Sequence, residues 1–144
     1  MPHKKVLFKL QRDDEGYPPA DVEGIWAEET ADGELIIDNI PFFAREATLG
    51  DIVEVSQAGE EIFYASTRKR SGNSLLRVVF FEGHDPAKLR AELARLGCST
   101  ELSHLQSLVA VNVPPEVKIE DVRALLNEGC SKGYWDYEEP ILRQ

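Results

Sequence analysis

The chain has 144 residues, 42% hydrophobic and 29% charged, with a formal net charge of −10 at pH 7. This length suits one domain or two small ones with a real hydrophobic core, and the composition excludes an intrinsically disordered chain. The longest apolar runs are interrupted by polar residues and are too short to cross a membrane. A strong negative charge repels nucleic acid phosphates and anionic lipids, so we expect neither as a partner.

The acidic residues are concentrated in the first half of the chain. Residues 13–61 contain fifteen Asp and Glu, against Arg45 as their single basic residue. Such a surface attracts cationic partners in a salt-dependent way, although acidity also simply keeps many proteins in solution. The first fourteen residues lack the continuous apolar stretch of a secretory signal, so we expect a cytoplasmic protein.

The first half is typical of a β structure. Five short runs with strand-like patterns are separated by turn residues. These runs cover residues 5–11, 24–30, 33–40, 50–56 and 61–70. The Asp32-Gly33 pair between two of them is a strong hairpin signal. We therefore predict a small β-barrel or a bent antiparallel sheet over residues 1–73.

The segment Pro41-Phe42-Phe43 interrupts this pattern. Pro41 cannot donate a hydrogen bond to a sheet, so we expect it to end the strand that carries Leu35 and Ile37 inward. Two adjacent residues in an extended chain point in different directions, so Phe42 and Phe43 cannot fill one pocket. We expect one ring to plug the open end of the barrel and both to serve mainly in packing.

The second half predicts an alternation of strands and helices. Strands are expected over residues 74–83, 99–105, 107–115 and 133–140, with helices over residues 85–97 and 119–128. Asp85 and Pro86 suit the beginning of the first helix, and Gly97 suits a left-handed C-cap. The order β-α-β-β-α-β is that of a ferredoxin-like unit over residues 74–144. The predicted fold class is therefore α+β, with two closely packed modules.

Two short segments, residues 93–99 and 125–131, share the pattern L-x-x-x-G-C-S. We interpret each Gly-Cys pair as the point where a helix hands over to the next strand. The two helices of such a unit run antiparallel, which places Cys98 and Cys130 at opposite ends of the sheet. We therefore expect no disulfide bond between them and reduced, packed thiols instead.

The chain contains none of the common catalytic or metal-binding motifs, so no catalytic residue, metal site or cofactor is predicted. His3 is expected in a frayed terminus. Cys98 and His104 could form a nucleophilic pair by spacing, but we expect them at opposite ends of one strand. Asp136 and Glu138 in the aromatic terminal strand could bind a cation, although edge strands often carry such charges.

Several stretches resemble a known family. The segments "GIWAEE", "DNIPFFARE", "LGDIVEV", "AVNVPP" and "GYWDYEEPIL" are similar to small bacterial proteins catalogued only as a domain of unknown function. The resemblance spans about Val6 to Leu142, and its most specific part is "DNIPFFA" followed after five residues by Gly-Asp. It implies a bacterial protein and carries over no activity and no site residues.

Two functional hypotheses follow. The first is a non-enzymatic acidic binding protein that docks a basic protein partner, most concretely an immunity or antitoxin protein that covers the active site of a cationic toxin. Its predicted contacts are eight loop and hairpin acids: Asp13, Asp14, Glu15, Glu23, Glu28, Glu29, Asp32 and Glu34. The alternative is a small-ligand-binding sensor or enzyme domain with a pocket between the two modules. Its predicted lining residues are Phe42, Phe43, Arg45 and Trp135.

Overall fold

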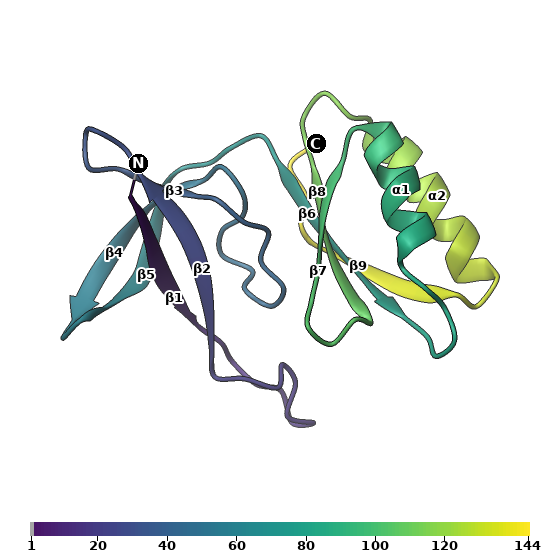
Figure 1. The fold of residues 1–144 in the computed structure, drawn as a ribbon, viewed down its shortest axis with the longest axis horizontal. Helices are drawn as coiled ribbons and strands as arrows, with labels where there is room; N and C mark the ends of the chain where they lie inside the picture. Colours follow the sequence, from purple (N-terminus) through teal and green to yellow (C-terminus); the bar gives the residue numbers. More distant parts are fainter. Residues whose placement is uncertain (1) are drawn as a thin grey trace. The chain divides into compact units, whose positions relative to one another are not determined.

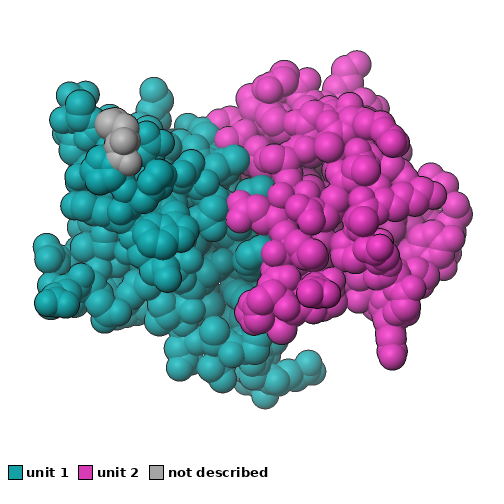
Figure 2. Space-filling view, viewed as in Figure 1, with its two compact units in different colours: residues 1–71 teal, residues 72–144 magenta. Residues whose placement is uncertain are grey.

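The structure is a computed structural model that describes residues 2–144. Within these residues the chain forms nine β-strands and two α-helices, a mixed α and β fold (Figure 1). The elements are β1 (His3–Lys9), β2 (Val22–Glu29), β3 (Leu35–Ile37), β4 (Ile52–Ala58), β5 (Glu61–Lys69), β6 (Ser74–Phe80), α1 (Ala87–Leu96), β7 (Ser99–Leu102), β8 (Leu108–Val113), α2 (Ile119–Ser131) and β9 (Trp135–Ile141). The chain divides into two compact units, residues 1–71 and residues 72–144 (Figure 2).

The first unit is a closed barrel of the five strands β1 to β5, which confirms the barrel predicted from the sequence. Neighbouring strands pair antiparallel, and a parallel pairing of β1 with β5 closes the barrel. Two register shifts in the β4–β5 pair bend this hairpin, as closure of so small a barrel requires. Gly33 has a φ of 82°, which the tight turn between β2 and β3 needs and a side chain would strain.

The barrel interior is filled by alternate residues of its strands, including Val6, Phe8 and Ile25, which are almost fully buried. The loop 38–51 adds Ala44 and Ala47 to this core. The prediction that a phenylalanine of this loop plugs the barrel is therefore wrong, since small alanine side chains enter the core. Phe42 and Phe43 are both half-buried, and the ring of Phe43 meets the edge of the Tyr17 ring at 5.9 Å.

The second unit is a four-stranded antiparallel sheet in the order β7-β8-β6-β9, with both helices on one face (Figure 1). The core between sheet and helices is apolar because strands and helices each direct one face toward it. Leu76 and Val109 from the strands and Leu93 and Leu126 from the helices are completely buried there. This arrangement leaves one end of the layer, where β6 ends and β9 begins, beside the first turn of α1 and the last turn of α2.

Helix α1 has the ends that the sequence predicts, moved by one residue at its start. Pro86 occupies the cap position, and the Asp85 carboxylate accepts a hydrogen bond from the Ala87 N–H at 3.0 Å. Gly97 ends the helix with a left-handed φ of 105°.

Helix α2 continues past its predicted end at residue 128. Gly129 and Cys130 lie inside it, and the chain turns at Gly133 instead, where φ is 77°. The interpretation of both Gly-Cys pairs as helix ends is therefore wrong for the second pair. Cys98 and Cys130 are both free thiols.

Strand β9 includes Pro140, which was expected to end it. The strand lies at the edge of the sheet, and its pairing with β6 shifts register between Leu75 and Arg77. An edge position with an irregular ladder tolerates proline, because no hydrogen bond from its nitrogen is required there.

Candidate functional site

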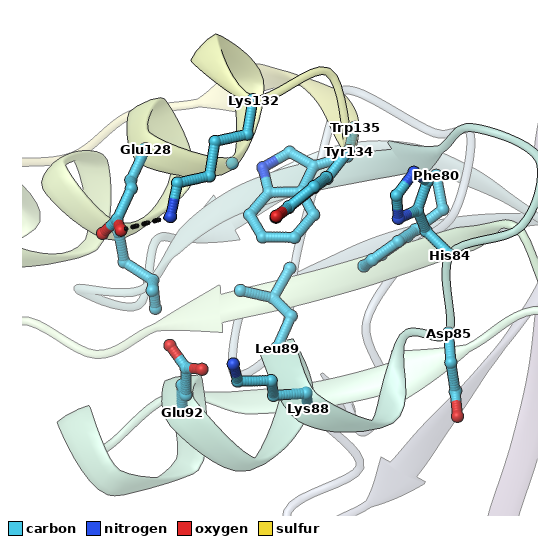
Figure 3. A pocket seen from close by; sticks show the side chains of 12 residues that line it. Phe80, His84, Asp85, Lys88, Leu89, Glu92, Glu128, Lys132, Tyr134 and Trp135 are labelled. Carbon is cyan, nitrogen blue, oxygen red and sulfur yellow. Dashed lines mark hydrogen bonds and ion pairs between the residues drawn. The ribbon is translucent and has the colours of Figure 1, made fainter.

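A pocket of about 200 Å³ lies within the second unit, at the end of the layer where the first turn of α1 faces the last turn of α2 (Figure 3). The ends of β6 and β9 supply its base. Its lining residues are Phe80, His84, Asp85, Lys88, Leu89, Glu92, Leu125, Glu128, Gly129, Lys132, Tyr134 and Trp135. The pocket therefore combines an apolar base with charged groups of both signs.

The position of Trp135 sets the shape of the pocket. Its indole N–H donates a hydrogen bond to the Leu126 carbonyl oxygen at 2.9 Å, and its ring packs against Phe80 with centroids 5.3 Å apart. A methyl group at Gly129 would overlap the indole ring, so glycine in the interior of α2 makes room for it. Glycine weakens a helix, but at this position its lack of a side chain leaves space for the Trp135 ring, which forms a wall of the pocket.

Tyr134 and His84 form the rim beside Trp135. The rings of Tyr134 and His84 lie 4.8 Å apart, and those of Tyr134 and Trp135 lie 5.9 Å apart. The Tyr134 hydroxyl group points into the pocket (Figure 3). These side chains supply aromatic surface together with polar groups that can hydrogen-bond a bound molecule.

Glu128 and Lys132 close the α2 side of the pocket with an ion pair of 2.9 Å (Figure 3). Their hydrogen bond, and then their charge attraction, lower the pKa of Glu128 and raise the pKa of Lys132. Each group thus holds the other in its charged form. The pair positions charge and is poorly suited to proton transfer at neutral pH.

Lys88 and Glu92 project from α1 toward the same pocket, one helical turn apart (Figure 3). Within residues 2–144, neither side chain takes part in a hydrogen bond or an ion pair. One ammonium group and one carboxylate without a hydrogen bond therefore lie at the mouth of an aromatic pocket, where charge attraction links Lys88 to Glu128 and Glu92 to Lys132. Ordering such a long side chain on a ligand costs about 0.5–1.5 kcal/mol, which its charge contact with the ligand has to offset.

The eight predicted partner contacts are spread over the first unit. Asp13, Asp14 and Glu15 lie in the loop that joins β1 to β2, whereas Asp32 and Glu34 lie in the turn that joins β2 to β3. These two connections are at opposite ends of β2 (Figure 1). The structure therefore does not bring the eight acids together on one face.

Several of these acids also have partners within the barrel unit. Glu29 pairs with Lys4 at 3.1 Å and Glu34 pairs with Arg68 at 3.2 Å. Asp13 accepts hydrogen bonds from two N–H groups of its own loop, at 2.9 and 3.0 Å. Such pairing lowers the charge that these residues can offer to a partner.

Glu23 has a structural task. Its two carboxylate oxygens accept hydrogen bonds from the N–H groups of Phe42, Phe43 and Ala44, at 2.7 to 2.9 Å. The carboxylate therefore holds the loop 38–51 against the barrel. Hydrogen bonds to a charged acceptor are stronger than neutral ones, which explains how a loop without strand pairing keeps one conformation.

Asp51 anchors the other end of the same loop. It is completely buried and accepts hydrogen bonds from the Thr48 N–H, the Ser71 N–H and the Ser71 hydroxyl, at 2.8 to 3.0 Å. Asn39 accepts a hydrogen bond from the Trp26 N–H at 2.7 Å. Asn39 of the family-like segment "DNIPFFA" and Asp51 of the Gly-Asp pair that follows it therefore serve loop structure.

The four residues of the alternative pocket belong to different units. Phe42, Phe43 and Arg45 lie in the loop 38–51 of the first unit, and Trp135 begins β9 in the second. Trp135 does line a pocket, together with residues of its own unit. Sequence reasoning missed Lys88, Glu92 and the meaning of Gly129, although a glycine inside a regular helix pattern was a signal for close packing.

Residues 23–137 match the family described as "Domain of unknown function (DUF4265)", which confirms the resemblance noted in the sequence. A crystal structure of a hypothetical protein from Neisseria gonorrhoeae is similar to the chain, with a TM-score of 0.80 and 25% sequence identity. The match covers 100% of this chain and 99% of that one. No curated protein matches the sequence. Neither helix within residues 2–144 is both long and apolar enough to span a membrane.

Proposed function

The chain belongs to the DUF4265 family, and we propose that it is a binding protein whose residues 72–144 hold a small zwitterion with an apolar side chain, such as a free amino acid. The observation that carries this proposal is a built pocket with an aromatic base and two opposite, available charges at its mouth. The order β-α-β-β-α-β and the sheet order β7-β8-β6-β9 also support a ferredoxin-like fold for this unit.

The apolar part of the ligand would lie against Trp135, Phe80 and Leu89. Leu89 and Phe80 are buried, and Trp135 is fixed by its hydrogen bond to helix α2. A rigid apolar base binds without losing side-chain entropy of its own. A volume of about 200 Å³ suits one small molecule of amino-acid size.

The charged part of the ligand would meet Lys88 and Glu92. Lys88 can pair with a carboxylate, and Glu92 can pair with an ammonium group. The Tyr134 hydroxyl group can donate or accept a further hydrogen bond. A zwitterion satisfies both charges at once, whereas a simple anion or cation leaves one of them opposed by a like charge.

Binding is favoured over catalysis by the electrostatics of the pocket. The pKa of Glu128 is lowered and the pKa of Lys132 is raised, so both are driven away from neutral pH. A general acid or base works best when its pKa lies near the operating pH. The pocket therefore recognises charge and does not transfer protons through this pair.

The proposal is tested with a panel of free amino acids and their decarboxylated and deaminated analogues. A ligand that binds only the folded state raises the melting temperature, and the stabilisation grows with the logarithm of the ligand concentration above the dissociation constant. We expect a shift with apolar amino acids, and a smaller shift with analogues that lack either charge. Lys88→Gln and Glu92→Gln should each abolish the shift. Lys118→Gln, at the N-cap of α2, and Glu120→Gln, in its first turn, are matched controls, because both side chains are exposed and lie outside the pocket. A wild-type protein that none of the panel stabilises would refute the proposal.

Docking of a basic protein partner, and with it an immunity or antitoxin role, is a second proposal. The loop 10–21 supports it, because Asp14 and Glu15 are exposed beside Tyr17, which is 48% exposed. Tyrosine is enriched at protein interfaces and among the residues that contribute most to their binding energy. An affinity for a basic partner that falls steeply with salt and is lost in Tyr17→Ala would support this role, and a salt-independent affinity would oppose it.

A further inference from the structure

Three metal-ligating side chains of the barrel unit meet outside the pocket described above, and one of them begins the loop 38–51. His3 begins β1 and lies opposite Glu28 of β2 in the strand register. Asp38 follows β3, and its N–H donates to the carbonyl oxygen of Trp26 in β2. One ligand atom from each of His3, Glu28 and Asp38 lies within 4.8 Å of the other two. The prediction that His3 lies in a frayed terminus is wrong, since it is part of a paired strand.

The electrostatics of this cluster favour a cation. His3 Nε2 lies 2.9 Å from a carboxylate oxygen of Asp38. In residues 2–144 no lysine or arginine forms an ion pair with either Glu28 or Asp38, and Glu28 has no hydrogen-bond partner for its carboxylate. Two carboxylates thus converge, one of them half-buried, and their mutual repulsion is relieved when a cation binds between them.

The nearest lysines are engaged elsewhere. Lys4 pairs with Glu29 at 3.1 Å, and the amine of Lys5 lies 5.4 Å from the centre of the Trp26 ring. Neither lysine therefore neutralises the cluster, although both follow His3 closely in β1. The barrel therefore places a histidine and two acids together without a basic side chain to balance them.

We propose that His3, Glu28 and Asp38 bind a divalent transition-metal ion of the zinc class. Imidazole with carboxylates suits Zn²⁺, Co²⁺ and Ni²⁺, whereas Ca²⁺ and Mg²⁺ prefer oxygen ligands alone. In a tetrahedral zinc site, bonds of about 2.0–2.1 Å place ligand atoms roughly 3.3 Å apart. The His3–Asp38 separation is already close to this value, and a rotation of the third side chain within the 4.8 Å cluster completes the set.

Strands β1 and β2 and the residue that follows β3 supply the ligands, so the bound ion would tie β1, β2 and the end of β3 together. The ion would stabilise the barrel, because a metal that binds only the folded state raises the free energy of unfolding. Its fourth position would be open to water or to a ligand from another molecule. Trp26 lies on β2 two residues before Glu28, and its carbonyl oxygen accepts a hydrogen bond from the Asp38 N–H, so it provides a built-in fluorescent reporter.

The test is a titration of the full chain, with reductant present, by ZnCl₂ in a calorimeter and by CoCl₂ in an absorption spectrometer. We expect one saturable ion per chain, a visible Co²⁺ spectrum of a site with nitrogen and oxygen ligands, and a change in Trp26 fluorescence. His3→Ala, Glu28→Gln and Asp38→Asn should each weaken the affinity by at least about tenfold. Circular dichroism checks that each variant is folded.

His104→Gln and Cys130→Ser are the matched controls, since a histidine or a thiol elsewhere can also hold these metals. Both should bind like the wild type. Saturable binding that survives His3→Ala and Glu28→Gln, or that disappears in either control, would overturn the assignment. Absence of any saturable binding to the wild-type chain would overturn it as well.

Discussion

The substitution Gly129→Ala separates helix propensity from packing around the pocket. Alanine in a helix interior is about 1 kcal/mol more favourable than glycine, so propensity alone predicts a more stable protein. The structure predicts the opposite, because the added methyl group would overlap the Trp135 ring. Displacing the ring costs about 1–3 kcal/mol of packing and about 1 kcal/mol for its hydrogen bond to the Leu126 carbonyl. We expect a net destabilisation of about 2 kcal/mol.

The assay is urea unfolding followed by circular dichroism and by tryptophan fluorescence in a Trp26→Phe background, where Trp135 is the remaining reporter. The same change in a Trp135→Leu background should be neutral or stabilising, because the space is then free. A Gly129→Ala variant that is more stable by the full propensity difference, with unchanged Trp135 fluorescence, would refute the packing argument.

Three further predictions concern the scaffold. Glu23→Ala leaves three N–H groups of the loop 38–51 without their acceptor. In urea titrations it should lower the free energy of unfolding by about 1.5–3 kcal/mol, and Glu23→Gln should recover only part of this loss. The hydrogen bond from Arg123 lowers the pKa of Glu139 below its usual 4.5. Ionised Glu139 therefore stabilises the folded state fully above pH 4.5, and this contribution is lost as the pH falls through the pKa of Glu139 in the folded protein. The stability gap between wild type and Glu139→Gln should therefore shrink on acidification, and a constant gap in melting temperature would contradict this. Burial raises the pKa of Cys98 to about 11, so it should react with a thiol reagent far more slowly than half-buried Cys130, and equal rates in the folded protein would oppose the structure.

Local sequence patterns were sufficient for most of the secondary structure. Alternating apolar residues predicted the strands of the barrel, and Asp32-Gly33 predicted the hairpin between β2 and β3. Both patterns depend only on residues that are close together in the sequence. Gly97 marked the end of α1 for the same reason. Gly129 was misread, since the same residue type serves at a helix end and at a close packing contact. The packing of Trp135, six residues further along the chain, against Gly129 is what shows that this glycine serves as a packing contact and not as a helix end.

The sites could not be predicted because distant residues create them. Glu23 looks like any other acid in an acidic segment, yet its carboxylate holds a loop about twenty residues further along the chain. Lys88 and Glu92 occupy ordinary surface positions of a helix, and the role that we propose for them depends on the aromatic residues Tyr134 and Trp135 on the other side of the pocket. His3, Glu28 and Asp38 are brought together by strand register. The net charge predicted that the surface of the first unit is acidic, but it could not predict which acids form ion pairs, such as Glu29 with Lys4 and Glu34 with Arg68.

The most direct test of the proposed function is a ¹H–¹⁵N NMR titration of the chain with a saturating apolar amino acid. The two tryptophan indole N–H signals report on separate places, Trp135 on the pocket and Trp26 on the barrel. Ligand in the pocket should shift the Trp135 signal progressively to saturation and leave the Trp26 signal in place, and Lys88→Gln should remove the effect. A Trp135 signal that stays fixed throughout the titration would contradict the proposal.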